Sequence, residues 1–156
     1  MRVLYLLRHA RPVSPDGTRD DFDRPLTPEG RVEATKVSNT LLVERLSNPC
    51  VLSSPATRAR ETTEIVISTN GWSSNFESRI YEAKLETLIK LIDEIDDACK
   101  VVILVGHNPG MESLLRCFTG ELRAMPTAGL AKIVLEIDSW REGANANARL
   151  EWIVSP

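Results

Sequence analysis

The chain has 156 residues, of which 42% are hydrophobic and 26% charged, and its net charge is −3 at pH 7. These values are typical of one packed domain over residues 1–156, and they exclude a disordered chain and a general nucleic-acid surface, which needs a positive face. The apolar run in the opening stretch MRVLYLLRHARP is too short for a signal peptide or a membrane span. We therefore expect a cytoplasmic protein without a membrane partner.

The cysteines and histidines give little support for a metal site. Cys50, Cys99 and Cys117 are odd in number and lack C-x-x-C spacing, so we interpret them as buried thiols without a disulfide. His9 and His107 form no H-x-x-x-H pair, which makes a zinc or iron site unexpected. We therefore expect a mechanism without a metal or another cofactor.

Short apolar runs alternate with amphipathic segments along the chain. The runs suit strands buried on both faces, and they lie at residues 3–7, 50–53 and 101–105. Apolar residues at helical spacing predict helices at residues 28–46, 56–68 and 83–97. Residues 130–137 and 149–154 alternate partly and predict a late strand pair, which the polar loop SWREGANANA separates.

This order of elements predicts an α/β fold with three α/β/α layers and a mainly parallel central sheet. In such a sheet, ligands bind beyond the carboxyl ends of the strands. Polar residues follow each of the first three predicted strands at that place. The first strand is followed by Arg8 and His9, the second by SSPATR and the third by GHNPG.

Three dipeptides with a capping side chain before proline mark predicted helix starts: Thr27-Pro28, Ser54-Pro55 and Asn108-Pro109. The second and third directly follow predicted strands, so the free backbone N–H groups of both helix starts are expected to face the crevice beyond the sheet. Helix starts of this kind bind anions.

Two arginines are predicted to reach the same crevice. Arg58 lies one turn inside the helix expected from Pro55, and its side chain leans toward the helix start, while Arg8 approaches from the first strand. Two guanidinium forks, two helix starts and an imidazole predict a site for a phosphoryl group or another tetrahedral oxyanion. Arg60 is expected to face water. Solvation is also the interpretation that we favour, over a role toward the substrate, for the loop charges Arg11, Arg19, Asp21 and Asp23.

These motifs resemble those of the histidine phosphatase superfamily, also called phosphoglycerate-mutase-like. The family signature of arginine, histidine and glycine after the first strand reads Arg8-His9-Ala10 here. SSPATRARETTEI is similar to the family's second-arginine motif, and GHNPG is similar to its second-histidine motif. The short length, DRPLTPEGR at residues 23–31 and GHNPGME resemble the SixA-type phosphohistidine phosphatases. Two features depart from the family: Ala10 replaces the usual glycine, and the insertions that cap the substrate site in larger members have no room here.

The resemblance implies a phosphoglycerate-mutase-like fold and roles for particular residues. His9 is the expected nucleophile, which forms a phosphohistidine intermediate that water hydrolyses. The expected catalytic residues are His9, Arg8, Arg58, His107 and Glu82. The expected substrate-binding residues are Arg8, Arg58, His107, Ser54 and Asn108. Glu82, in RIYEAKLE, is the candidate proton donor, and a first-turn acid that stabilises a helix N-terminus is the alternative.

From this resemblance we expect a metal-independent phosphatase that acts on phosphohistidine of a partner protein, because a small, uncapped site can admit a protruding side chain. A phosphatase of small phosphomonoesters is the first alternative. A noncatalytic module that docks phosphorylated proteins is the second, and the intact pair of His9 and His107 argues against it.

Overall fold

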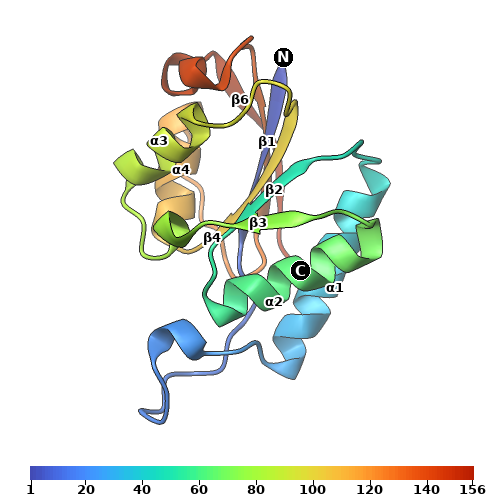
Figure 1. Ribbon diagram of the computed structural model, residues 1–156, viewed down its shortest axis with the longest axis vertical. Coiled ribbons are helices and arrows are strands. Elements are labelled where there is room, and N and C mark those ends of the chain that lie inside the picture. The colour runs from blue at the N-terminus through green and yellow to red at the C-terminus, as the bar shows by residue number, and fades with distance from the viewer.

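The computed structural model describes all residues, 1–156, and consists of one six-stranded sheet between two layers of helices (Figure 1). The strands are β1 (Arg2–Arg8), β2 (Cys50–Ser53), β3 (Ser74–Phe76), β4 (Val101–Gly106), β5 (Leu130–Leu135) and β6 (Ala148–Val154). Their order across the sheet is β3-β2-β4-β1-β5-β6. The first four strands in that order pair in parallel, whereas β5 and β6 pair antiparallel. The prediction of a mainly parallel sheet is confirmed, and the short strand β3 was not predicted.

The helices cover both faces of this sheet. They are α1 (Pro28–Val43), α2 (Thr57–Asn70), α3 (Leu85–Asp93) and α4 (Gly110–Thr119), with the 3-10 turns η1 (Asp21–Asp23), η2 (Ser78–Ile80) and η3 (Trp140–Asn145). In β1, Leu4 and Leu6 pack into one apolar cluster with residues of α3 and α4. Tyr5 and Leu7 pack into a second cluster with residues of α1 and α2. Because neighbouring residues of a strand point to opposite faces, the unbroken apolar run of β1 serves both clusters, and the three-layer prediction is confirmed.

The polar loop SWREGANANA is more ordered than its composition predicts. It contains η3, and Trp140 at the start of η3 is completely buried. The indole Nε1 donates a hydrogen bond to the carbonyl oxygen of Cys99 at 2.7 Å, and the Arg2 guanidinium lies 5.6 Å from the ring centroid. The buried Trp140 ring, with a partner for its N–H group, therefore anchors this polar segment on the core.

The interpretation of three buried thiols is wrong. Cys50 and Cys99 form a disulfide with Cα atoms 6.0 Å apart, and Cys117 is exposed. Cys50 begins β2 and pairs with Val102 of β4, just after Cys99 in the chain, so the sheet brings together two cysteines that are 49 residues apart. The structure contains no helix with the length and apolar character needed to cross a membrane.

Thr27 caps α1 as predicted, because its Oγ1 accepts a hydrogen bond from the Gly30 backbone N–H at 3.0 Å. We expect Thr27→Ala to lower the free energy of unfolding by about 1 kcal/mol in urea denaturation. Thr35→Ala is the matched control, since the exposed Thr35 hydroxyl only donates to the Arg31 carbonyl within α1. Equal losses in the two variants would contradict the capping role.

Candidate active site

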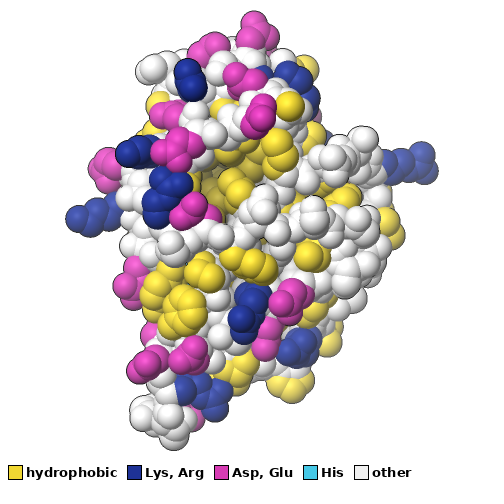
Figure 2. All heavy atoms as spheres, in the orientation of Figure 1, with side chains coloured by type: hydrophobic (Ala, Val, Ile, Leu, Met, Phe, Trp, Pro, Cys, Tyr) yellow, Lys and Arg dark blue, Asp and Glu magenta, His cyan; other side chains and the backbone are white.

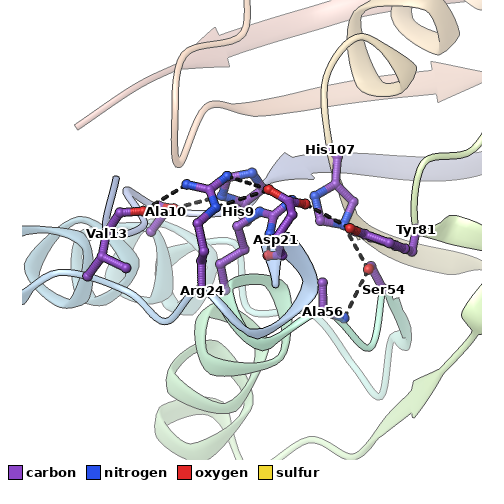
Figure 3. A network of polar contacts seen from close by, with 10 residues as sticks. His9, Ala10, Val13, Asp21, Arg24, Ser54, Ala56, Tyr81 and His107 are labelled. Carbon is purple, nitrogen blue, oxygen red and sulfur yellow. Dashed lines mark hydrogen bonds and ion pairs between the residues drawn. The ribbon is translucent and has the colours of Figure 1, made fainter. Parts of the chain in front are cut away.

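Parallel pairing brings the three predicted motifs together at one edge of the sheet. β1 pairs with β4 as far as Arg8, and β2 pairs with β4 as far as Ser53. The residues that follow these strands, His9, His107 and Ser54, are therefore neighbours (Figure 3). The ring centroids of His9 and His107 lie 5.1 Å apart.

His9 is fixed by its backbone and by its ring. Its N–H donates to the Gly106 carbonyl at 3.0 Å, and its carbonyl accepts from the Ala128 N–H at 3.0 Å. The ring Nδ1 lies 2.8 Å from the Ala10 carbonyl oxygen. A carbonyl oxygen only accepts, so Nδ1 carries the proton and donates it. Nε2 consequently keeps the free lone pair, which makes it the nucleophilic atom of the ring.

Ala10 fits the position at which the family signature has glycine. Its side chain is completely buried, and its N–H donates to the Thr62 Oγ1 at 3.0 Å. Its φ is not positive, unlike that of Ala128 nearby. The backbone at this position therefore has no need of the left-handed conformation that favours glycine.

His107 is held by Ser54. The ring Nε2 lies 2.7 Å from the Ser54 Oγ, and this Oγ accepts a hydrogen bond from the Ala56 N–H at 3.2 Å. The hydroxyl hydrogen of Ser54 is then available for Nε2. In the tautomer in which Ser54 donates this hydrogen to Nε2, Nδ1 of His107 is an N–H donor. Nδ1 is buried and has no partner within the protein.

Both imidazoles are neutral at pH 7. Burial is the largest cause that lowers the pKa of His9, to about 4, and the Arg58 and Arg8 guanidinium groups lower it further. Burial also lowers the pKa of His107 to about 3, with added repulsion from His9 and Arg58. His9 is 5% exposed, and no histidine is visible on the face of the molecule in Figure 2. Taking these rings out of water disfavours the charged form, so the nucleophilic lone pair is preserved.

Arg8 and Arg58 both present an unmatched N–H group in this region. Arg8 donates from Nη1 to the Met125 carbonyl at 3.1 Å, and Arg58 donates from its two Nη atoms to Asp21. The Nε atoms of Arg8 and Arg58 are buried without a partner within the protein. Only six buried side-chain polar atoms in the chain lack a partner, and four of them belong to Arg8, Arg58, His107 and Asn108. Such atoms are rare in folded proteins, so their concentration here indicates a polar ligand site.

The predicted caps at Ser54 and Asn108 are wrong. α2 begins at Thr57 with Ala56 as its N-cap, and α4 begins at Gly110 with Pro109 as its N-cap. Pro55 and Pro109 both lie in the turn before the helix rather than at its first position, so the residue before each proline cannot be the N-cap. Arg58 is consequently the second residue of α2, closer to the helix start than expected.

Ser54 and Asn108 nevertheless lie in the site. Ser54 is buried and holds His107, as described above. The Asn108 amide Nδ2 donates to Glu112 Oε1 at 2.8 Å and to the Met125 carbonyl at 2.9 Å. Met125 also accepts from Arg8, so Asn108 connects the start of α4 to the segment that fixes the first arginine.

Glu82 lines a cleft of about 540 Å³ that reaches Arg58 and His107. It is exposed, and its φ of +52° lies in the left-handed region. α3 begins at Leu85 with Glu86 in its first turn, so Glu82 precedes the helix and the first-turn alternative is wrong. The position of Glu82 in the cleft is compatible with a proton donor, and that role stays a prediction.

Asp21 and Tyr81 are the site residues that sequence reasoning missed. Asp21 was expected to be a solvated loop charge, but it lines the same cleft and pairs with Arg58 at 3.0 Å. The Tyr81 hydroxyl donates to Asp21 Oδ2 at 2.7 Å, and the Tyr81 ring lies edge-on to His107 with centroids 5.5 Å apart. No spacing rule connects two loop residues that are 60 positions apart.

The other loop charges behave as expected. Asp23 and Arg19 are exposed, and Arg11 lies 3.4 Å from Glu33 on the surface. Arg60 is exposed on α2. No group of three or more His, Cys, Asp or Glu side chains is placed to bind a metal ion.

The two imidazoles should resist protonation as the pH falls. Since both folded-state pKa values are lowered, we expect the ring NMR signals of His9 and His107 to stay those of neutral imidazole from about pH 8 down to about pH 5, through the usual midpoint of about 6.5. The chain has only two histidines, so the spectrum of His9→Ala contains the ring signals of His107 alone. Comparison with the wild type then assigns the signals of both histidines. Titration of either ring near the usual midpoint would contradict the burial argument.

Comparison with known proteins identifies the family. The sequence profile of the histidine phosphatase superfamily (branch 1) matches residues 4–100, which include Arg8, His9 and Arg58. An uncharacterized protein of Mycobacterium tuberculosis is 34% identical over 108 residues, which are 69% of this chain and 66% of that protein. The chain thus spans slightly less than two thirds of that relative.

Solved structures agree with this match. A candidate phosphohistidine phosphatase SixA from Agrobacterium tumefaciens is 31% identical and superimposes with a TM-score of 0.86 over 99% of this chain and 98% of that chain. The protein histidine phosphatase SixA complexed with tungstate, which is 22% identical, has the same fold, with a TM-score of 0.84 over 99% of this chain and 97% of that chain. The chain therefore belongs to the histidine phosphatase superfamily and to its SixA-type branch.

Proposed function

We propose that the protein is a phosphatase that uses His9 as a covalent nucleophile, and that its substrate is phosphohistidine on a partner protein. One observation supports the proposal most directly. Two guanidinium groups whose buried Nε–H donors are unmatched within the protein lie near a neutral imidazole whose Nε2 lone pair is free. An electron-rich nucleophile next to donors for a dianionic group is the arrangement that phosphoryl transfer requires.

In the first step, Nε2 of His9 attacks phosphorus in line with the bond to the leaving group. The new P–N bond forms while the bond to the leaving group breaks, so the phosphoryl group passes to His9. The ring gains positive charge during the attack. The Nδ1–H of His9, which donates to the Ala10 carbonyl at 2.8 Å, supports that charge and fixes the ring orientation.

The surrounding donors stabilise the phosphoryl oxygens during the transfer. The Nε–H groups of Arg8 and Arg58 and the Nδ1–H of His107 are buried and unmatched within the protein, so they are available for these oxygens. Because they are fixed before the substrate arrives, little reorganisation is needed at the moment of reaction.

In the second step, water attacks the phosphohistidine and releases inorganic phosphate. His9 leaves as the neutral ring, which its lowered pKa of about 4 favours at pH 7. Glu82 is the proposed proton donor to an alcohol leaving group and the proposed base for the water. Its place in the same cleft as Arg58 and His107 supports both roles.

A phosphatase of small phosphomonoesters is the second candidate, because of the cleft beside the site. Its volume of about 540 Å³ lies within the range of about 300–1,000 Å³ that is typical of small-molecule pockets. The two candidates differ in the leaving group. Phosphohistidine releases an imidazole, whereas a phosphomonoester releases an alcohol that departs poorly unless an acid protonates it.

The proposed function is tested by turnover and trapping without added metal. We expect hydrolysis of a phosphohistidine protein at the highest kcat/KM among that protein and a panel of phosphomonoesters. His9→Ala should abolish turnover, and alkaline quenching of the wild type should trap phosphate on His9. Arg60→Ala, which removes an exposed cation of α2, is the control and should keep its activity.

Two outcomes would contradict His9 as the nucleophile, and a third would contradict phosphohistidine as the substrate. Substantial hydrolysis by His9→Ala, or trapped phosphate on a serine or an aspartate, would show a different nucleophile. A higher kcat/KM for a phosphomonoester would instead favour the second candidate, with the His9 mechanism unchanged.

Glu82→Gln tests the leaving-group acid and keeps the side-chain shape at a position with positive φ. We expect single-turnover phosphoryl transfer from an alkyl phosphomonoester to slow by about 10²-fold or more, the usual contribution of a positioned acid. Transfer from a phosphohistidine protein should slow only mildly, because a ring protonated on its other nitrogen leaves as neutral imidazole. Equal effects on both substrates, or none on either, would remove Glu82 from this role.

A further inference from the structure

Asp21 connects three separate segments around the site. Its Oδ1 accepts from Arg24 Nε at 3.0 Å and from Arg24 Nη2 at 2.9 Å. Its Oδ2 accepts from Arg58 Nη2 at 3.0 Å and from the Tyr81 hydroxyl at 2.7 Å. Figure 3 shows the Asp21 side chain between Arg24 and Tyr81. Each carboxylate oxygen thus accepts two hydrogen bonds, which fills the acceptor capacity of the group.

Asp21 binds one particular edge of the Arg58 guanidinium group. Arg58 Nη1 donates to the Asp21 backbone carbonyl at 2.7 Å, and Nη2 donates to the carboxylate, so the end that carries both Nη atoms is occupied. The Nε–H on the adjoining edge is buried and has no partner within the protein. When Asp21 occupies the end of the guanidinium that carries the two Nη atoms, the edge that carries Nε stays free to bind an anion.

The same residue also fixes its surroundings. Arg24 donates from Nη1 to the Val13 carbonyl at 2.7 Å, which holds the loop that carries Asp21. Phe22 lies edge-on to the Tyr81 ring with centroids 5.1 Å apart. Since the Tyr81 ring also contacts His107, the interactions of Asp21 reach both the second arginine and the second histidine of the site.

We propose that Asp21 is a positioning residue, which clamps the end of the Arg58 guanidinium so that its Nε edge faces the phosphoryl group. The inference rests on the proposed function, because it assigns Arg58 to the phosphoryl oxygens. It differs from a role in which the carboxylate occupies the oxyanion site and competes with the ligand. A carboxylate that already accepts four hydrogen bonds and faces two guanidinium groups is a saturated part of the framework.

The test uses the full-length protein and tungstate as the probe, with binding measured by calorimetry and turnover measured in parallel. Asp21→Asn keeps the shape but turns one acceptor oxygen into an amide nitrogen that faces only donors. We expect tungstate binding to weaken by about 10-fold to 100-fold, the range of one charge-assisted hydrogen bond. Asp23→Asn, an exposed carboxylate in the same 3-10 turn without an ion pair, is the matched control and should bind tungstate like the wild type.

A double-variant cycle separates positioning from a general effect on the loop. If Asp21 acts through Arg58, Asp21→Asn should cause little further loss of tungstate affinity in an Arg58→Ala background. Tyr81→Phe removes one donor to Asp21 and should cause a smaller loss than Asp21→Asn. The melting temperature of Asp21→Asn should stay close to that of the wild type, since the Asp21 side chain is 48% exposed.

Three outcomes would overturn the inference. Tighter tungstate binding by Asp21→Asn would mean that the carboxylate competes with the oxyanion. If Asp21→Asn binds tungstate as tightly as Asp23→Asn does, Asp21 has no role at Arg58. The same follows if Asp21→Asn loses as much tungstate affinity in the Arg58→Ala background as it does in the wild type. If instead the wild type neither binds tungstate nor hydrolyses any phosphorylated substrate, the proposed function itself fails.

Discussion

Parallel pairing of β1, β4 and β2 is the constraint on which the site depends. His9, Ser54 and His107 are distant in the chain, and they become neighbours only because the carboxyl ends of these strands lie level. A register shift of one residue between β1 and β4 would move His107 by about 3.3 Å relative to His9 and turn its strand over. The apolar clusters on both faces oppose such a shift, because it would exchange the side chains that pack into the two clusters, and each cluster is closely packed around its own set.

The same burial sets the chemistry of the site. Burial keeps the two imidazoles neutral. Burial also makes an unmatched guanidinium N–H group unfavourable in free energy, because the group has lost its water. Arg8 and Arg58 repel each other, and Asp21 supplies a negative charge in an ion pair with Arg58. The arrangement therefore combines a neutral imidazole with positively charged surroundings whose charge is only partly compensated. Such a site favours a dianionic group over a neutral one.

Sequence reasoning succeeded where a local pattern determines the outcome. Unbroken apolar runs predicted β1, β2 and β4, and the polar residues after these runs predicted which side chains would meet, because strand ends in a parallel sheet share an edge. Sequence reasoning failed where the path of a loop determines which residues come into contact. The partnership of Asp21 with Tyr81 and the Cys50–Cys99 disulfide join segments that no periodicity relates. The caps expected at Ser54 and Asn108 failed for the same reason, since the turns before α2 and α4 lengthen the approach to each helix.

Ala10 has a consequence for how relatives of this protein are recognised. Its methyl group is completely buried, and its backbone conformation is open to any residue with a small side chain. What the position limits is side-chain volume rather than backbone freedom. A search pattern that demands glycine after the arginine and histidine of the family signature would omit this chain, whereas a pattern that admits alanine would retain it together with any relatives that have the same exchange.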